Sequence, residues 1–292
     1  MEIEDTYCEA FDGFFSRLMI TAKDDKRLRR AACDATALPS TVFGKSEGGI
    51  EKWLKESETP DGRKGVLIQI WVNYRKNAKE KLEDELGWRI RQGVLVVPTT
   101  SVFNALDSDN KIDMMDKVGH CGDGYEYVER YRARAVINIP IMMPTFRIER
   151  HLGCKRGVAG GNLWFMCATE EAALEAGDKA LEAMNQVEGV ITPFDVCSAG
   201  SKPETNYPEI GPTTNHPYCP TLKGKIKGSK VPEGVNYIPE IVINGMSLDA
   251  VKEAMKAAIR GVKGVKGLLR ISAGNYGGRL SKYKIYLCEL SP

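Results

Sequence analysis

Residues 163–171 read Leu163-Trp164-Phe165-Met166-Cys167-Ala168-Thr169-Glu170-Glu171, and this stretch decides the fold. The apolar run that ends at Cys167 is typical of a buried strand. Thr169 can cap a helix, and the carboxylates of Glu170 and Glu171 suit the positive end of a helix in its first turn. We therefore expect a strand followed directly by a helix, which is how a β-α-β unit begins.

The rest of the C-terminal half completes this unit. The positions of the helix that we expect to face inward are Leu174, Gly177, Leu181 and Met184. After Gly189 we expect a third element over 190–194, a strand over 240–243 and a closing strand over 268–271. Ser247 caps a second helix, whose expected inward positions are Leu248, Val251, Met255 and Ile259.

The N-terminal half shows the same order of elements. We expect strands over 18–22, 41–44, 66–72 and 94–97, with one helix that begins near Asp24 and another over 76–86. The turn signal Pro60-Asp61-Gly62 corresponds to Pro232-Glu233-Gly234 in the other half. The sequence therefore predicts an α+β protein of two duplicated ferredoxin-like, split β-α-β lobes. We expect them to cover residues 1–144 and 145–292 and to meet near Pro144.

Composition narrows the class of protein. The chain has 292 residues, of which 42% are hydrophobic and 27% charged, which excludes disordered and fibrous proteins. Its 41 Lys and Arg against 39 Asp and Glu give a net charge of only +2, which argues against a dedicated nucleic-acid binder. A ferredoxin-like RNA-binding module would also need an RNP-like aromatic pattern, which we do not find.

The sequence also indicates where the protein works. The acidic start, Met1-Glu2-Ile3-Glu4-Asp5, lacks the pattern of a signal peptide, and no apolar run reaches the roughly 20 residues that a membrane span needs. The eight cysteines include no Cys-x-x-Cys pair and read as buried thiols of a reducing compartment. We expect a soluble, cytoplasmic protein without a membrane partner.

Glu240 is the most informative single residue. It immediately precedes Ile241-Val242-Ile243, so a buried strand carries its carboxyl group or lies beside it. Burial raises the pKa of a carboxyl group, and a raised pKa suits a general acid or base. The alternative, an ordinary strand residue that faces water, stays open at this point.

Several segments could form the rest of a site. The irregular insertions 107–134 and 198–230 are the first places to look. The glycine clusters 157–162 and 272–278 either let a ligand approach the backbone or let two backbones pack closely, and both interpretations stay open. The basic clusters near residues 26–30 and 223–230 are either solvated or bind an anionic small molecule.

The standard motifs for several other activities are absent. We find no P-loop, no Gly-x-Ser-x-Gly and no His-Glu-x-x-His motif. The three histidines lie near cysteines, as His120-Cys121, His151 with Cys154 and His216 with Cys219, which allows a zinc site built from separate loops. Because the ligand spacings of known zinc sites are missing, we favour loop histidines beside buried thiols.

Motifs along almost the whole chain resemble one family, the formylmethanofuran:tetrahydromethanopterin formyltransferases. These motifs are Glu2 to Thr6, Thr59 to Arg63, Pro98 to Thr100, Gly122 to Tyr125, Val158 to Asn162, Tyr218 to Thr221, Glu240 to Gly245 and Ile271 to Gly278. The resemblance implies an archaeal cytoplasmic acyltransferase of one-carbon metabolism and methanogenesis. It would transfer a formyl group from formylmethanofuran to N5 of tetrahydromethanopterin, or of tetrahydrosarcinapterin, through a ternary complex and a tetrahedral intermediate.

The resemblance also implies the site. The family has two ferredoxin-like lobes, assembles as homo-oligomers, commonly tetramers, and works without a metal or prosthetic group, with both coenzymes as substrates. Its candidate acid/base falls on Glu240. The residues that we expect to bind the substrates are Gly160, Gly161, Asn162, Ser201, Lys202, Asn244, Ser272 and Asn275.

The chain departs from the family pattern at three places. Ser46-Glu47-Gly48-Gly49-Ile50 replaces an Ala-Glu-Ala-Gly-Ile run, Asp195 follows Pro193-Phe194 where the family has a Gly-Gly pair, and the stretch after Met143 is basic instead of acidic. Some of these changes fall in expected substrate loops. An alternative hypothesis is therefore an inactive or altered-specificity paralogue that serves as a coenzyme-binding or complex subunit.

Overall fold

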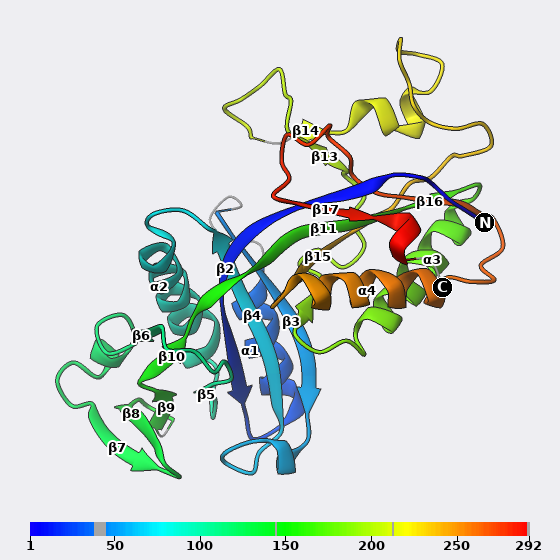
Figure 1. Cartoon of the computed structure of the whole chain (residues 1–292). Helices are drawn as coiled ribbons and strands as arrows, with labels where there is room; N and C mark the ends of the chain where they lie inside the picture. Colours follow the sequence, from blue (N-terminus) through cyan, green and yellow to red (C-terminus); the bar gives the residue numbers. More distant parts are fainter. Residues whose placement is uncertain (38–44, 144, 212, 291–292) are drawn as a thin grey trace. The chain divides into compact units, whose positions relative to one another are not determined.

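The computed structural model describes residues 1–37, 45–143, 145–211 and 213–290 (Figure 1). It divides into two compact units, which we treat separately. The N-terminal unit is Asp12–Gly157, and the C-terminal unit combines Met1–Phe11 with Val158–Pro292. Pro144, where we expected the lobes to meet, lies outside the described residues.

The N-terminal unit contains a four-stranded antiparallel sheet in the order β5-β2-β4-β3. Along the chain these strands are the fourth, first, third and second, which is the strand order of a ferredoxin-like fold. The sheet continues through β9, β8 and β7, and a separate pair joins β6 to β10. The bounds are β2 (Tyr7–Thr21), β3 (Ser46–Leu54), β4 (Gly65–Asn73), β5 (Ser101–Asn104), β6 (Lys111–Asp113), β7 (Tyr127–Tyr131), β8 (Arg134–Pro140), β9 (Thr145–Glu149) and β10 (His151–Gly153).

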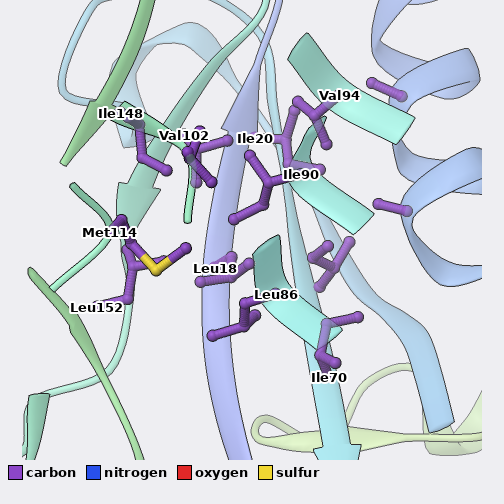
Figure 2. Close-up of a cluster of buried hydrophobic side chains, with 14 of the residues drawn as sticks. Leu18, Ile20, Ile70, Leu86, Ile90, Val94, Val102, Met114, Ile148 and Leu152 are labelled. Carbon is purple, nitrogen blue, oxygen red and sulfur yellow. The ribbon is translucent and has the colours of Figure 1, made fainter. Parts of the chain in front are cut away.

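The helices of this unit, α1 (Asp25–Thr36) and α2 (Ala78–Arg89), pack against the sheet. The Asp24 side chain caps α1 by accepting the backbone N–H of Arg27, as its position before the helix predicts. Figure 2 shows part of the core between these layers, in which Leu18 of β2 lies beside Leu86 of α2 and Ile20 of β2 lies beside Ile90. The predicted strand 66–72 and helix 76–86 are confirmed within a few residues, whereas the predicted strand 41–44 lies outside the described residues.

The predicted strand over 94–97 is wrong. The chain continues from α2 as a π-helix over Ile90–Leu95, and the strand follows later as β5. Gly93 lies so close to α1 that a Cβ atom there would be 2.8 Å from the backbone nitrogen of Ala35. Val94 is fully buried in this contact between helices. The apolar residues that suggested a strand are therefore apolar because they pack between helices.

The C-terminal unit repeats the arrangement. Its strands lie in the order β16-β11-β15-β12, again the fourth, first, third and second along the chain. The predicted duplication of a ferredoxin-like unit is thus confirmed. The bounds are β11 (Lys155–Cys167), α3 (Glu170–Met184), β12 (Val190–Ile191), β15 (Glu240–Gly245), α4 (Leu248–Gly261) and β16 (Leu268–Ser272). Further pairs join β1 (Glu2–Ile3) to β16, β17 (Tyr283–Tyr286) to β2, and β13 (Ser201–Lys202) to β14 (Thr213–Thr214).

Different segments pack on the two faces of this sheet. Leu163 and Phe165 of β11 pack with α3 and α4, whereas Trp164 and Met166 pack with Val231 and Val235 of the segment before β15. In Figure 1, the helices lie on one side of these strands and the yellow insertion on the other. Thr169 and Ser247 cap α3 and α4, as predicted.

Two details of this unit differ from the sequence prediction. Leu174 is 57% exposed and does not face inward, because the buried stripe of α3 runs through alanines, Ala172, Ala176 and Ala180, instead. The element predicted over 190–194 is a strand over Val190–Ile191 alone. In the described part of the chain, no helix combines the length and the apolar character needed to cross a membrane.

Candidate active site

Glu240 opens β15 directly opposite Trp164 of β11, and Trp164 has Ser272 of β16 opposite it on the other side. Residues in one register row of a sheet point to the same face. Glu240, Trp164 and Ser272 therefore share the face that the insertion covers, away from α3 and α4. Asn162 lies two residues before Trp164 on the same strand and so belongs to this face as well.

The carboxyl group of Glu240 is buried, with the residue 5% exposed. Its Oε1 accepts the indole N–H of Trp164 at 3.0 Å, and its backbone pairs with Cys197 through two hydrogen bonds of 2.7 and 2.8 Å. Burial raises the pKa of Glu240, and the hydrogen bond from Trp164 opposes that rise only in part. The first of our two interpretations, a buried carboxyl group, is confirmed, while its catalytic role stays a prediction.

The insertion holds Trp164 in place. The ring of Tyr218 meets the indole edge to face with the centroids 4.7 Å apart. The ammonium group of Lys230 lies 5.7 Å from the centre of the Tyr218 ring. One of the two insertions that the sequence singled out thus packs on the indole that donates to Glu240.

Cys8 lies beside Asn162, although 154 residues separate them in the chain. The backbone N–H of Asn162 points to the Cys8 sulfur at 3.0 Å, and the side-chain oxygen of Asn162 accepts the backbone N–H of Gly274 at 2.6 Å. Full burial, with the nearby charge of Glu240 adding to it, raises the pKa of Cys8 to about 12. In the sequence, Cys8 was one buried thiol among several, and no signal marked it as part of this cluster.

Tyr276 is a second neighbour that the sequence did not single out. Its hydroxyl donates to the carbonyl of Ser201 at 2.6 Å, which ties the glycine-rich loop to the insertion. Burial is the main cause that raises the pKa of this phenol, and the charges of Glu240 and Cys8 contribute. Glu240, Asn162, Ser272 and the backbone of Ser201 are therefore gathered in one part of the C-terminal unit.

The surroundings of the other predicted substrate residues are as follows. Asn244 is fully buried and accepts the backbone N–H of Gly160 at 3.0 Å. Gly160 has a φ of +79°, and Gly161 packs against Val251 of α4. Asn275 is exposed and bonds to Thr6 and Gly277. Lys202 is partly exposed in β13. Whether these residues bind substrate stays a prediction.

Two of the three histidines have carboxylate neighbours. His120 Nδ1 lies 2.7 Å from Glu126, and His151 lies 3.6 Å from Asp113. Within the described ranges, no three His, Cys, Asp or Glu side chains gather as a metal site would require. The expectation that the protein needs no metal remains a prediction.

The similarity to known proteins extends over nearly the whole chain. Residues 1–141 match the family model described as formylmethanofuran-tetrahydromethanopterin formyltransferase, and residues 144–290 match the model of its proximal lobe. A formyltransferase-like protein of Archaeoglobus fulgidus is 59% identical over 99% of this chain and 96% of its own. The formyltransferase of Methanocaldococcus jannaschii is 44% identical over 99% of this chain and 97% of its own.

Two solved structures share the fold. The formyltransferase from Methanosarcina barkeri superposes with a TM-score of 0.92 at 40% identity, covering 99% of this chain and 98% of its own. A formyltransferase/hydrolase complex from Methylorubrum extorquens, solved with methylofuran, contains a chain with a TM-score of 0.91 at 33% identity, covering 99% of this chain and 97% of that one. The chain therefore belongs to the formylmethanofuran–tetrahydromethanopterin formyltransferases, a family of transferase enzymes.

Proposed function

We propose that this protein transfers the formyl group of formylmethanofuran to N5 of tetrahydromethanopterin or of tetrahydrosarcinapterin. One observation carries the proposal: in a chain of this family, the buried carboxyl group of Glu240 has a raised pKa and no cation bound to it among the described residues. A carboxyl group with a raised pKa keeps its proton to higher pH than an ordinary carboxyl group, and acyl transfer between two amines needs a group that can take up and release a proton.

In the proposed mechanism, N5 of the pterin attacks the formyl carbon within a ternary complex. A C–N5 bond forms, and the negative charge of the tetrahedral intermediate collects on the formyl oxygen. Glu240 takes the proton that N5 loses and delivers it to the furan amine as the old C–N bond breaks. Amide N–H groups stabilise the oxyanion through hydrogen bonds. The side-chain oxygen of Asn162 is occupied by Gly274, so its Nδ2 is the donor that this residue can offer.

The anionic groups of the coenzymes need cationic partners. We assign this task to Lys202 and to the lysines of the insertion, Lys223, Lys225, Lys227 and Lys230. We further propose that the transfer needs no metal or prosthetic group, since proton transfer and oxyanion stabilisation suffice for this chemistry. A cytoplasmic homotetramer of archaeal origin completes the proposal, and the eight free thiols are in keeping with a reducing compartment.

The test is direct. Purified protein is mixed with both coenzymes, and formation of the N5-formyl product is followed by pterin absorbance. We expect turnover by the wild type and a loss of roughly 10²–10⁴ in kcat for Glu240→Gln, with coenzyme binding retained. Unchanged turnover in Glu240→Gln would remove this carboxyl group from the mechanism.

A second candidate function has its own support. The relatives at 52–59% identity are named formyltransferase-like proteins, whereas those named formyltransferase without this qualifier are 42–44% identical. This difference favours a paralogue that binds a coenzyme or serves in a larger complex. Tight binding of either coenzyme without any turnover in the same assay would support this function over the first.

A further inference from the structure

We propose that Trp164 is a positioning residue that fixes the orientation of the Glu240 carboxyl group and so selects the oxygen that carries its proton. The inference rests on the proposed function of Glu240, because it concerns how the same carboxyl group works. It assigns a role to a tryptophan whose sequence context indicates only an apolar strand.

The first support is the hydrogen bond itself. An indole N–H can only donate, so it must point at a lone pair of the carboxyl oxygen, here Oε1 at 3.0 Å. Within the described residues, this is the one hydrogen bond to the Glu240 carboxyl group. With Oε1 occupied by a donor, the proton of the neutral acid is placed on Oε2, which becomes the oxygen that can exchange a proton with a substrate amine.

The second support is the rigidity of the indole. Trp164 sits in the middle strand of the row, with β15 on one side and β16 on the other. Trp164 is 3% exposed, and its ring packs with Val231 and Val235 and meets Tyr218 edge to face. A ring confined in this way has one direction in which to present its N–H group, so it can impose an orientation on a carboxyl group that would otherwise rotate.

The third support is electrostatic. A hydrogen bond from a neutral donor to a carboxylate favours the charged form, whereas burial favours the neutral form. Both effects act on the pKa of Glu240, with burial the larger. Trp164 therefore limits how far the pKa of Glu240 rises and keeps the carboxylate available as a base.

The experiment removes the N–H donor and keeps an aromatic ring at position 164. Trp164→Phe removes the donor, and benzothienylalanine at position 164 removes it without changing the size of the ring. In both variants we expect the acidic limb of the kcat/KM against pH profile to move up by about one unit, because the carboxylate loses a charge-assisted hydrogen bond. Trp53→Phe, at a 41% exposed tryptophan of the other unit, is the matched control and should leave the limb in place.

A second measurement does not depend on turnover. The carboxyl carbon of Glu240 is titrated by NMR in glutamate-labelled protein, with its signal assigned as the one that Glu240→Gln removes. A midpoint about one unit higher in both variants supports the proposal even where the wild type shows no formyl transfer, which separates it from the proposed function. An unmoved midpoint in the benzothienylalanine protein, or activity that falls equally at all pH values with no shift of the limb, would overturn it.

Discussion

The carboxylate of Glu9 accepts the backbone N–H of Tyr276 at 2.7 Å, although β2 and the glycine-rich loop lie at opposite ends of the chain. The same oxygen accepts the N–H of Gly278 at 2.6 Å, and the other oxygen accepts that of Leu280 at 2.9 Å. Glu9 is 2% exposed, so these three donors supply what water would otherwise give a buried charge. One side chain thus holds the loop that carries the Tyr276 phenol toward the insertion.

Substituting Glu9→Gln should loosen this loop. The glutamine amide has a single acceptor oxygen, and its NH₂ group would face a backbone N–H that has lost its partner. We expect a loss of about 2 kcal/mol or more in the free energy of unfolding, measured by urea titration, and faster proteolysis within residues 274–280. Glu182→Gln, at an exposed position of α3, should change neither quantity. Equal stability of the Glu9 and Glu182 variants would show that the loop does not depend on the Glu9 carboxylate.

The raised pKa of Glu240 predicts a pH-dependent stability. At pH values below the ordinary carboxyl range, the group is protonated in both the folded and the unfolded states and costs nothing. As pH rises, the unfolded chain ionises first, so the folded state loses stability until Glu240 also ionises there. Each unit by which the pKa is raised corresponds to about 1.4 kcal/mol.

Glu240→Gln removes this dependence, so the variant should gain stability relative to the wild type with rising pH. The measurement is the free energy of unfolding at a series of pH values, taken as the difference between the two proteins. Glu182→Gln, at an exposed position of α3, again serves as the control. A difference that stays flat for Glu240→Gln as well would contradict a raised pKa at this position.

We expect the buried and the exposed cysteines to differ in their reactivity toward alkylating reagents. Cys8 is fully buried, with a pKa raised to about 12, and Cys167 is buried with a pKa raised to about 11, so neither forms much thiolate at neutral pH. Cys33 and Cys288 are exposed, so the interpretation of all eight cysteines as buried thiols is wrong. In native protein treated with iodoacetamide, mass spectrometry should find label on the exposed pair and none on the buried pair. Denaturation before labelling should make all four equal, and prompt labelling of Cys8 in the native state would refute its burial.

The sequence could predict the elements better than their partners. Local signals such as the caps Thr169 and Ser247 were sufficient to place helices, because capping is decided within one turn. The continuous apolar run of β11 predicted a strand but could not say that Phe165 would meet the helices and Trp164 the insertion. The strand predicted over 94–97 was wrong because the sequence does not distinguish a valine buried in a helix contact, such as Val94, from a valine buried in a strand.

The same limit applies to the candidate site. Glu240 could be identified from its place before an apolar strand, but no local pattern reveals that Tyr218, Val231 and Val235 pack over the neighbouring Trp164. Cys8 and Glu9 reach the site from β2, more than 150 residues from Asn162 and Tyr276. Contacts over such distances follow from the order of strands in the sheet, and that order becomes known only from the structure.

A substitution at Gly161 tests whether the glycine cluster serves close packing or the approach of a ligand. A Cβ atom at this position would lie 2.6 Å from Val251 Cγ1 and 3.2 Å from the carbonyl oxygen of Ile243, closer than packed atoms allow. If close packing explains this glycine, Gly161→Ala should cost about 1–3 kcal/mol in the free energy of unfolding without changing the affinity of the folded protein for either coenzyme. Val251→Ala opens space beside it, so the double variant should lose less stability than the two single losses together, which a double-mutant cycle measures. A Gly161→Ala protein as stable as the wild type but unable to bind a coenzyme would instead mean that a ligand approaches the backbone here.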